Sequence, residues 1–151
     1  MTQHTALEPV RKQISIDCDV DTAFRTFTDD IATWWPVESH SITGEGTTAV
    51  FEPGVGGRLY ERAPDGQEHD WGAILIYEPP HRVVLEWKVN PAAPPTELEV
   101  RFRADGHGTR VELEHRGWEQ YPSGGDDERG SYDAGWDTVL GTFVESASKK
   151  A

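Results

Sequence analysis

Two ionisable side chains, Glu61 and His115, are predicted to lie on an otherwise apolar face of a sheet. In GRLYER the two arginines are expected to point outward together with Tyr60, which turns Glu61 inward. In TRVELEH the charged residues also take alternate positions, which turns His115 inward. A carboxylate and an imidazole that meet there could hold or pass a proton near neutral pH. The two residues are therefore catalytic candidates, candidates for orienting the polar end of a ligand, or a structural pair that holds the sheet in register.

The six tryptophans are the second unusual feature of this chain of 151 residues. Trp34 and Trp35 are adjacent in DDIATWWPVESH, and neighbours on a helix or a strand cannot be buried in the same direction. One is expected in the core, while the other faces different surroundings. We expect Trp35 to converge with Trp71, Trp87 and Trp136, from two strands and the terminal helix, on one internal hollow. The alternative is that all of them are ordinary core residues.

The remaining motifs do not indicate a cofactor or a metal. The glycines of EPGVGG do not match the G-x-G-x-x-G pattern of phosphate-binding loops, and they join two strands rather than a strand and a helix. The six histidines never occur at H-x-x-x-H or H-x-H spacing, so no metal site and no cofactor are expected. The single cysteine, Cys18, excludes an intramolecular disulfide and is expected to be a small buried residue rather than a nucleophile.

Composition limits the classes of partner. Fourteen Lys and Arg against 27 Asp and Glu give a net charge of −13 without a basic cluster, so binding to nucleic acid or to an anionic membrane is not expected. The start of the chain, MTQHTALEPVRKQ, lacks the apolar core of a signal peptide, and the longest aliphatic run, AILIY, is too short to span a membrane. We expect a cytoplasmic protein with a single domain over residues 1–151, of which residues 1–9 form a flexible N-terminus.

A sheet and a long helix must position the candidate residues. Alternation in VRKQISIDC predicts a first strand. The spacing in DVDTAFRTFTDDIATWW then predicts one helix, or two short helices broken near residues 29–30, with Asp21 or Thr22 as the N-cap. Six strands separated by turns rich in glycine and proline follow between Thr47 and Trp118. Short turns between successive strands favour an antiparallel meander.

The last segment returns to helical spacing, with Tyr132, Trp136, Val139, Leu140, Phe143 and Ala147 on one stripe. The predicted fold class is α+β: a curved seven-stranded antiparallel sheet wrapped around a long C-terminal helix, with short helices after the first strand. A curved sheet and a helix rarely fill the space between them, so a concave ligand site is expected there. Access to it is expected near the glycine-rich loop at residues 121–130.

Strand alternation also predicts which side chains face the helix. The expected inner rows are Val111, Leu113 and His115, then Leu98, Val100 and Phe102, then Val83, Leu85 and Trp87. In DWGAILIY the row of Trp71, Ala73, Leu75 and Tyr77 is favoured over Ile74 and Ile76. The predicted ligand-binding residues are Trp35, Glu61, Trp71, Trp87, Phe102, His115, Tyr132 and Trp136.

Several motifs together resemble one known family. IATWWPVESH, VFEPGVGGRLYE, WGAILIYEPPHRVVLEW, TRVELEHRGWE and YDAGWDTVLGTF are similar to bacterial proteins of the activator of heat-shock protein 90 ATPase homologue-like family, within the START-like (SRPBCC) helix-grip superfamily. The resemblance covers about Val10 to Val144 and implies a helix-grip fold with a deep hydrophobic cavity. It maps onto Trp35, Gly56, Gly57, Glu61, Trp71, Gly72, Trp87, His115, Gly135 and Trp136.

The function predicted from the pattern and the resemblance is binding of a small hydrophobic or aromatic ligand between the sheet and the terminal helix, as a carrier or a sensor. Two alternatives stay open: a co-chaperone-like interaction module, and a cyclase or hydrolase that uses Glu61 and His115. A chaperone or a second copy of the chain is the possible protein partner.

Overall fold

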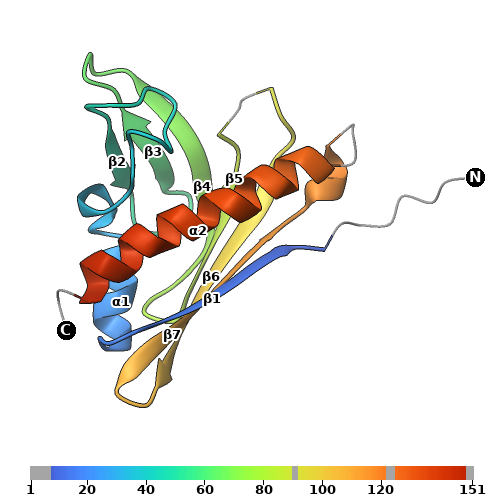
Figure 1. Cartoon of the computed structure of the whole chain (residues 1–151). Helices are drawn as coiled ribbons and strands as arrows, with labels where there is room; N and C mark the ends of the chain where they lie inside the picture. The colour runs from blue at the N-terminus through green and yellow to red at the C-terminus, as the bar shows by residue number, and fades with distance from the viewer. Residues whose placement is uncertain (1–7, 90–91, 122–124, 149–151) are drawn as a thin grey trace, which may run out of the picture.

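The computed structural model describes residues 8–89, 92–121 and 125–148, and in that part of the chain a seven-stranded sheet carries a long helix (Figure 1). In chain order the elements are β1 (Val10–Ile16), α1 (Val20–Phe27), the 3-10 helix η1 (Ile31–Thr33), β2 (Thr48–Phe51), β3 (Arg58–Arg62), β4 (Glu68–Glu78), β5 (Arg82–Trp87), β6 (Thr96–Asp105), β7 (Gly108–Arg116), the 3-10 helix η2 (Trp118–Gln120) and α2 (Asp126–Ser148). The strands lie in the order β1-β7-β6-β5-β4-β3-β2, and every neighbouring pair is antiparallel. The predicted fold class is confirmed.

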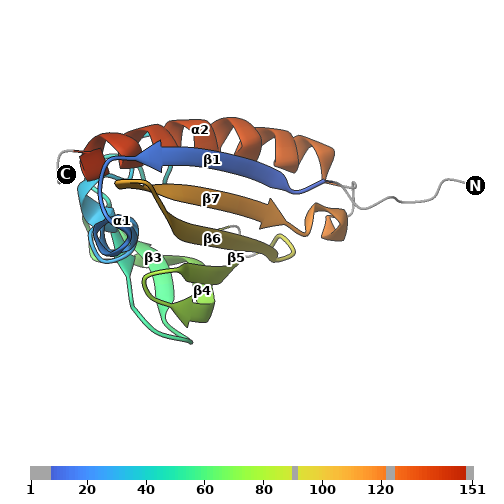
Figure 2. The ribbon, with the colours of Figure 1, turned by 90° about the horizontal axis from the view of Figure 1, so that it is seen from below.

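The sheet curls beneath α2, as the view from below shows (Figure 2). β1 lies next to α2, and the strands from β7 to β4 follow a curve away from it. Lys12 on β1 forms ion pairs with Asp133 and Asp137 on α2, at N–O distances of 2.6 and 3.0 Å. Because these two aspartates are one helical turn apart, a single lysine fixes α2 along the edge of the sheet.

The segment after β1 forms two short helices, which was one of the two predicted arrangements. α1 ends at Phe27, and η1 follows after a break that includes residues 29–30. The predicted caps Asp21 and Thr22 were wrong: Asp19 is the N-cap, and its carboxylate accepts a hydrogen bond from the Thr22 N–H at 2.8 Å. β1 therefore ends at Ile16, earlier than expected, and α1 begins at Val20.

The inner face of the sheet and the buried side of α2 form the core. The three rows predicted on β5, β6 and β7 are all buried, as are Trp136, Val139, Leu140, Phe143 and Ala147 on α2. Trp34 packs against Phe27 and Phe143, with ring centroids 5.3 and 5.1 Å away. One of the two adjacent tryptophans is thus a core residue, as predicted.

Two predictions about β4 and β3 need correction. Ile74 is buried and Leu75 is 44% exposed, because the pairing of β4 shifts twice, against β3 at Trp71 and against β5 between Ile74 and Ile76, and each shift exchanges the faces of the strand. Tyr60 is buried although it was expected to point to solvent, because the Arg58 guanidinium lies over its ring at 4.0 Å from the centroid.

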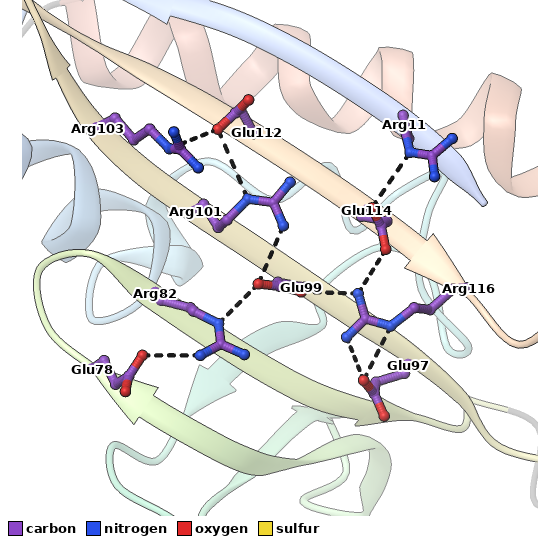
Figure 3. Close-up of polar contacts among 10 residues, drawn as sticks. All are labelled: Arg11, Glu78, Arg82, Glu97, Glu99, Arg101, Arg103, Glu112, Glu114 and Arg116. Carbon is purple, nitrogen blue, oxygen red and sulfur yellow. Dashed lines mark hydrogen bonds and ion pairs between the residues drawn. The ribbon is translucent and has the colours of Figure 1, made fainter.

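The opposite face of the sheet carries a ladder of charges (Figure 3). Five arginines and five glutamates from five strands alternate along it: Arg11, Arg82, Arg101, Arg103 and Arg116 with Glu78, Glu97, Glu99, Glu112 and Glu114. Glu99 lies at its centre and contacts Arg82 at 2.8 Å, Arg116 at 2.9 Å and Arg101 at 3.3 Å. Positive and negative charges balance in this ladder, so it adds no net charge to that face.

Candidate functional site

A pocket of about 190 Å³ lies between the sheet, α2 and the segment that follows η1. Four of its ten lining residues are tryptophans: Trp35, Trp71, Trp87 and Trp136. Their ring centroids lie 4.9 Å apart for Trp35–Trp71 and 5.5 Å apart for Trp87–Trp136. The rest of the wall consists of His40, Ser41, Val89, Tyr132, Gly135 and Val139. The four tryptophans predicted to converge therefore do so around an unfilled space.

The secondary structure explains this convergence. Tyr132, Gly135, Trp136 and Val139 have the spacing of one helix face, so α2 presents them together. Trp71 and Trp87 come from β4 and β5, which are paired in the sheet. Trp35 follows η1 and is directed to the pocket because its neighbour Trp34 takes the core position.

Glu61 lies behind the pocket wall, where it is fully buried. Its carboxylate accepts four hydrogen bonds: from the Trp71 indole at 2.7 Å, the Ile42 N–H at 2.6 Å, and the Thr43 N–H and hydroxyl at 2.9 and 2.7 Å. Burial raises the pKa of the Glu61 carboxyl, but these donors together outweigh burial and lower the pKa below its usual value. Glu61 is thus an ionised anchor for the backbone at residues 42–43.

His115 is also fully buried, and its hydrogen bonds define its protonation. The Trp136 indole can only donate, so His115 Nδ1 accepts its proton at 3.0 Å. Nε2 then carries the ring proton and donates it to Thr96 Oγ1 at 2.7 Å, and Thr96 donates to the Trp87 carbonyl at 3.3 Å. Burial, helped by the charge of Arg116, lowers the pKa of His115 to about 3. His115 is a neutral residue with both ring nitrogens engaged.

Glu61 and His115 do not form a hydrogen bond or an ion pair with each other. Each one instead holds a different indole of the pocket, Trp71 for Glu61 and Trp136 for His115. Phe102, another predicted site residue, also lies elsewhere: it is buried against Phe24 and Phe27, with centroid distances of 5.2 and 5.8 Å. Of the eight predicted residues, five line the pocket: Trp35, Trp71, Trp87, Tyr132 and Trp136.

All four indole N–H groups of the pocket already have partners in the protein. Besides the two bonds above, Trp35 donates to the His40 carbonyl at 2.8 Å, and Trp87 donates to the Tyr132 hydroxyl at 3.2 Å. The indoles therefore offer a ligand flat apolar surfaces and no free donor. The polar groups left on the wall are the side chains of His40, Ser41 and Tyr132.

His40 and Ser41 were missed as site residues from the sequence. His40 closes the stretch that contains the paired tryptophans, but a histidine without metal spacing carries no signal of a pocket position. The helix interior offered a clue: Gly135 lies in the middle of α2, where glycine costs about 1 kcal/mol relative to alanine. A Cβ at this position would lie 3.7 Å from Cδ2 and Nε2 of His40. The missing side chain leaves space beside the histidine ring.

A larger groove of about 880 Å³ runs along the outer side of β3, β4 and β5. Half of its ten lining residues are charged, and Arg58 there is already paired with Glu68 and Asp70 at 3.2 and 3.1 Å. Within the described residues, no cluster of three or more His, Cys, Asp or Glu side chains could hold a metal ion. No helix in that part of the chain has the length and apolar character needed to cross a membrane.

Two predictions concern segments that the structure describes only in part. The loop expected to give access to the pocket, residues 121–130, includes residues 122–124, which lie outside the described residues. Residues 1–7 of the N-terminus that was expected to be flexible also lie outside them.

The sequence model of the family named activator of Hsp90 ATPase homolog 1-like protein matches residues 17–147. The chain belongs to this family. No curated protein sequence gives a significant match. The resemblance inferred from the motifs is thereby confirmed, together with the SRPBCC type of fold.

Solved structures with the same fold include proteins with described roles. CalC from Micromonospora echinospora, described as a self-sacrificing resistance protein, is 28% identical, with a TM-score of 0.71 over 95% of this chain and 96% of that chain. Txn09, described as an anthrahydroquino-gamma-pyrone synthase complexed with SUM, is 31% identical, with a TM-score of 0.59 over 95% and 99%. MLL2253 from Mesorhizobium loti, 17% identical with a TM-score of 0.72 over 95% and 98%, shares the fold alone.

Proposed function

We propose that this protein binds a small aromatic or hydrophobic molecule in the tryptophan-lined pocket and acts as a carrier or a sensor of it. The observation that carries the proposal is the unfilled space of about 190 Å³ between four indoles that come from distant parts of the chain. The pocket is partly open to the outside, and contact between its apolar walls and water is unfavourable. A ligand that fills the pocket removes this apolar surface from water and gains contacts with the rings.

The size of the pocket limits the ligand. An apolar cavity of about 150 Å³ in another protein stays dry and takes up benzene. A pocket of about 190 Å³ is therefore suited to a compound of one or two fused rings. The indole faces favour a flat ligand, because offset and edge-on ring contacts contribute about 0.5–1.5 kcal/mol each beyond buried area.

The hydrogen bonds of Glu61 and His115 favour binding over acid–base catalysis by this pair. A general base must reach the proton that it removes, and neither residue is on the pocket wall. A docking role of the outer sheet face for a chaperone also receives little support, because its arginines and glutamates neutralise one another. The name of Txn09, a synthase solved with SUM, is compatible with a small-molecule pocket in this fold.

A methyl group placed in the pocket tests the proposal. Gly135→Ala fills space beside His40 in ordinary van der Waals contact, so we expect the free protein to gain up to about 1 kcal/mol from better helix propensity. The same methyl group competes with a ligand, at about 1–3 kcal/mol for overpacking, so the Kd for naphthalene should rise about fivefold or more. Titration of indole emission with naphthalene measures the Kd, and urea unfolding measures the stability.

Gly141→Ala is the matched control. Gly141 lies on the same helix and is exposed, and a Cβ at this position would have no atom within 4 Å. The Gly141→Ala variant should show the same gain in stability with an unchanged Kd for naphthalene. Failure of the wild-type protein to bind naphthalene or other one- and two-ring aromatics would contradict the proposal, and so would equal Kd values for the two variants.

A further inference from the structure

Two polar atoms on the pocket wall have unused hydrogen-bonding capacity. His40 Nδ1 lies 2.7 Å from Ser39 Oγ, whereas no described residue hydrogen-bonds to His40 Nε2. The Tyr132 hydroxyl accepts the Trp87 indole proton, and no described residue accepts the proton of Tyr132. A ligand in the pocket therefore meets one imidazole nitrogen and one hydroxyl donor on walls that are otherwise apolar or already satisfied.

The segment that carries His40 is held in place from several sides. The His40 N–H donates to the Pro36 carbonyl at 2.9 Å, and the His40 carbonyl accepts from Trp35 at 2.8 Å. Further along, Glu61 binds the backbone N–H groups of Ile42 and Thr43. A ring that is already positioned loses little entropy when it binds a ligand, which makes His40 suited to recognition.

Gly135 keeps the free edge of this ring accessible. The ring atoms nearest to a built Cβ at position 135 are Cδ2 and Nε2, so the unpaired nitrogen is on the side of His40 that faces α2. Tyr132 is one turn earlier on the same helix face. His40 and Tyr132 thus line one space, next to the indole walls.

We propose that the pocket is selective for planar aromatic compounds that carry a hydroxyl group, which His40 Nε2 and the Tyr132 hydroxyl recognise together. An aromatic hydroxyl can donate its proton to Nε2 and accept the proton of Tyr132. Nε2 is an acceptor when Nδ1 holds the ring proton and donates it to Ser39 Oγ, whose own proton can go to the Pro36 carbonyl at 3.5 Å. An aromatic compound without the hydroxyl leaves both polar atoms dehydrated and unpaired, which a binding site discriminates against strongly.

The inference rests on the proposed function, and a pair of matched probes separates the two. Equilibrium dialysis with 2-naphthol and with naphthalene gives both Kd values without relying on indole emission. We expect the wild-type protein to bind 2-naphthol at least about fivefold more tightly, the factor expected for two modest hydrogen bonds. His40→Phe keeps a flat ring without Nε2 and should reduce this ratio at least about twofold.

Two further variants make the result interpretable. His40→Gln restores a hydrogen-bonding group and should recover part of the preference, which a merely structural role of the ring does not predict. His81→Phe changes an exposed histidine away from the pocket and should leave the ratio at the wild-type value.

Each result decides between the two proposals. Equal wild-type affinities for the two probes would overturn the inference and leave the proposed function standing. An undiminished preference for 2-naphthol in both His40 variants would also overturn it. No binding of either probe would contradict the proposed function, and the inference with it.

Discussion

At the scale of single residues, the two ionisable groups inside the fold have opposite charge states. Glu61 is ionised because four donors outweigh the effect of burial on its pKa, whereas His115 is neutral because burial and the charge of Arg116 lower its pKa. Both orient a tryptophan of the pocket. They are positioning residues, and the sequence predicted their inward direction correctly without revealing what they bond to.

Protonation of His115 should make stability depend on pH. The pKa of His115 is about 3 in the folded protein and 6.5 in a model compound, so the unfolded state takes up the proton first as pH falls. Its contribution is fully present above pH 6.5 and decreases by about 1.4 kcal/mol per pH unit below it. Urea unfolding between pH 7 and 5, above the range where carboxyl groups titrate, measures the slope.

His115→Gln is the comparison, since glutamine can bond to Trp136 without taking up a proton. The variant should be less stable at pH 7 and should have a slope about 1.4 kcal/mol per pH unit smaller than that of the wild type. Identical slopes would mean that folded and unfolded protein bind the His115 proton equally well, which would contradict a lowered pKa of His115.

Glu61→Gln should destabilise the protein by about 1–3 kcal/mol at pH 7, because an amide cannot accept from all four donors and leaves a buried one unpaired. The pKa of Glu61 is below its usual value when folded, so its stabilising effect is present above about pH 4.5 and is lost as pH falls further. The gap between wild type and variant should therefore narrow below pH 4.5 in urea unfolding curves. A constant difference in the free energy of unfolding between the two proteins down to pH 3 would contradict an ionised Glu61.

At the scale of elements, the alternation of apolar and charged residues predicted the inward-facing side chains correctly wherever charged residues identified the outer face. On β6 and β7, the alternating glutamates and arginines led to the correct inward orientation of Val100, Leu113 and their neighbours. β4 has no charge between Trp71 and Glu78, so nothing in DWGAILIY reveals the two register shifts, against β3 and against β5, that bury Ile74 and expose Leu75. A bulge depends on pairing with neighbouring strands, which a local pattern does not contain.

The charge ladder on the outer face joins the strands in a way that single ion pairs do not (Figure 3). Burial raises the pKa of the Glu99 carboxyl, but Arg116, Arg82 and Arg101 around it lower the pKa below its usual value. Glu99→Gln should cost about 1–3 kcal/mol in chemical unfolding, because three guanidinium groups then share a neutral amide. Glu78→Gln, at the exposed end of the ladder, should cost less than about 1 kcal/mol. Equal losses would show that Glu99 is no more than another surface pair.

At the scale of the whole molecule, the sequence predicted the sheet, the terminal helix and the convergence of four tryptophans. It missed His40 and Ser41, and it assigned Phe102 to the pocket although this residue belongs to the core beside α1. Facing inward was the only property that could be derived for Phe102, and the inner face is longer than the pocket. Which part of that face stays unfilled depends on where α1 and α2 lie, and this is a property of the assembled molecule.

The closeness of the pocket indoles has an optical consequence. Trp35 has the rings of Trp71, Trp136 and Trp87 at centroid distances of 4.9, 6.0 and 6.3 Å. At such separations an excited state migrates between the rings faster than it decays, so these chromophores behave as one antenna. A quencher that contacts any one of these rings therefore lowers the emission of all of them, so the tryptophans of the pocket act as an optical reporter of its contents without an attached dye.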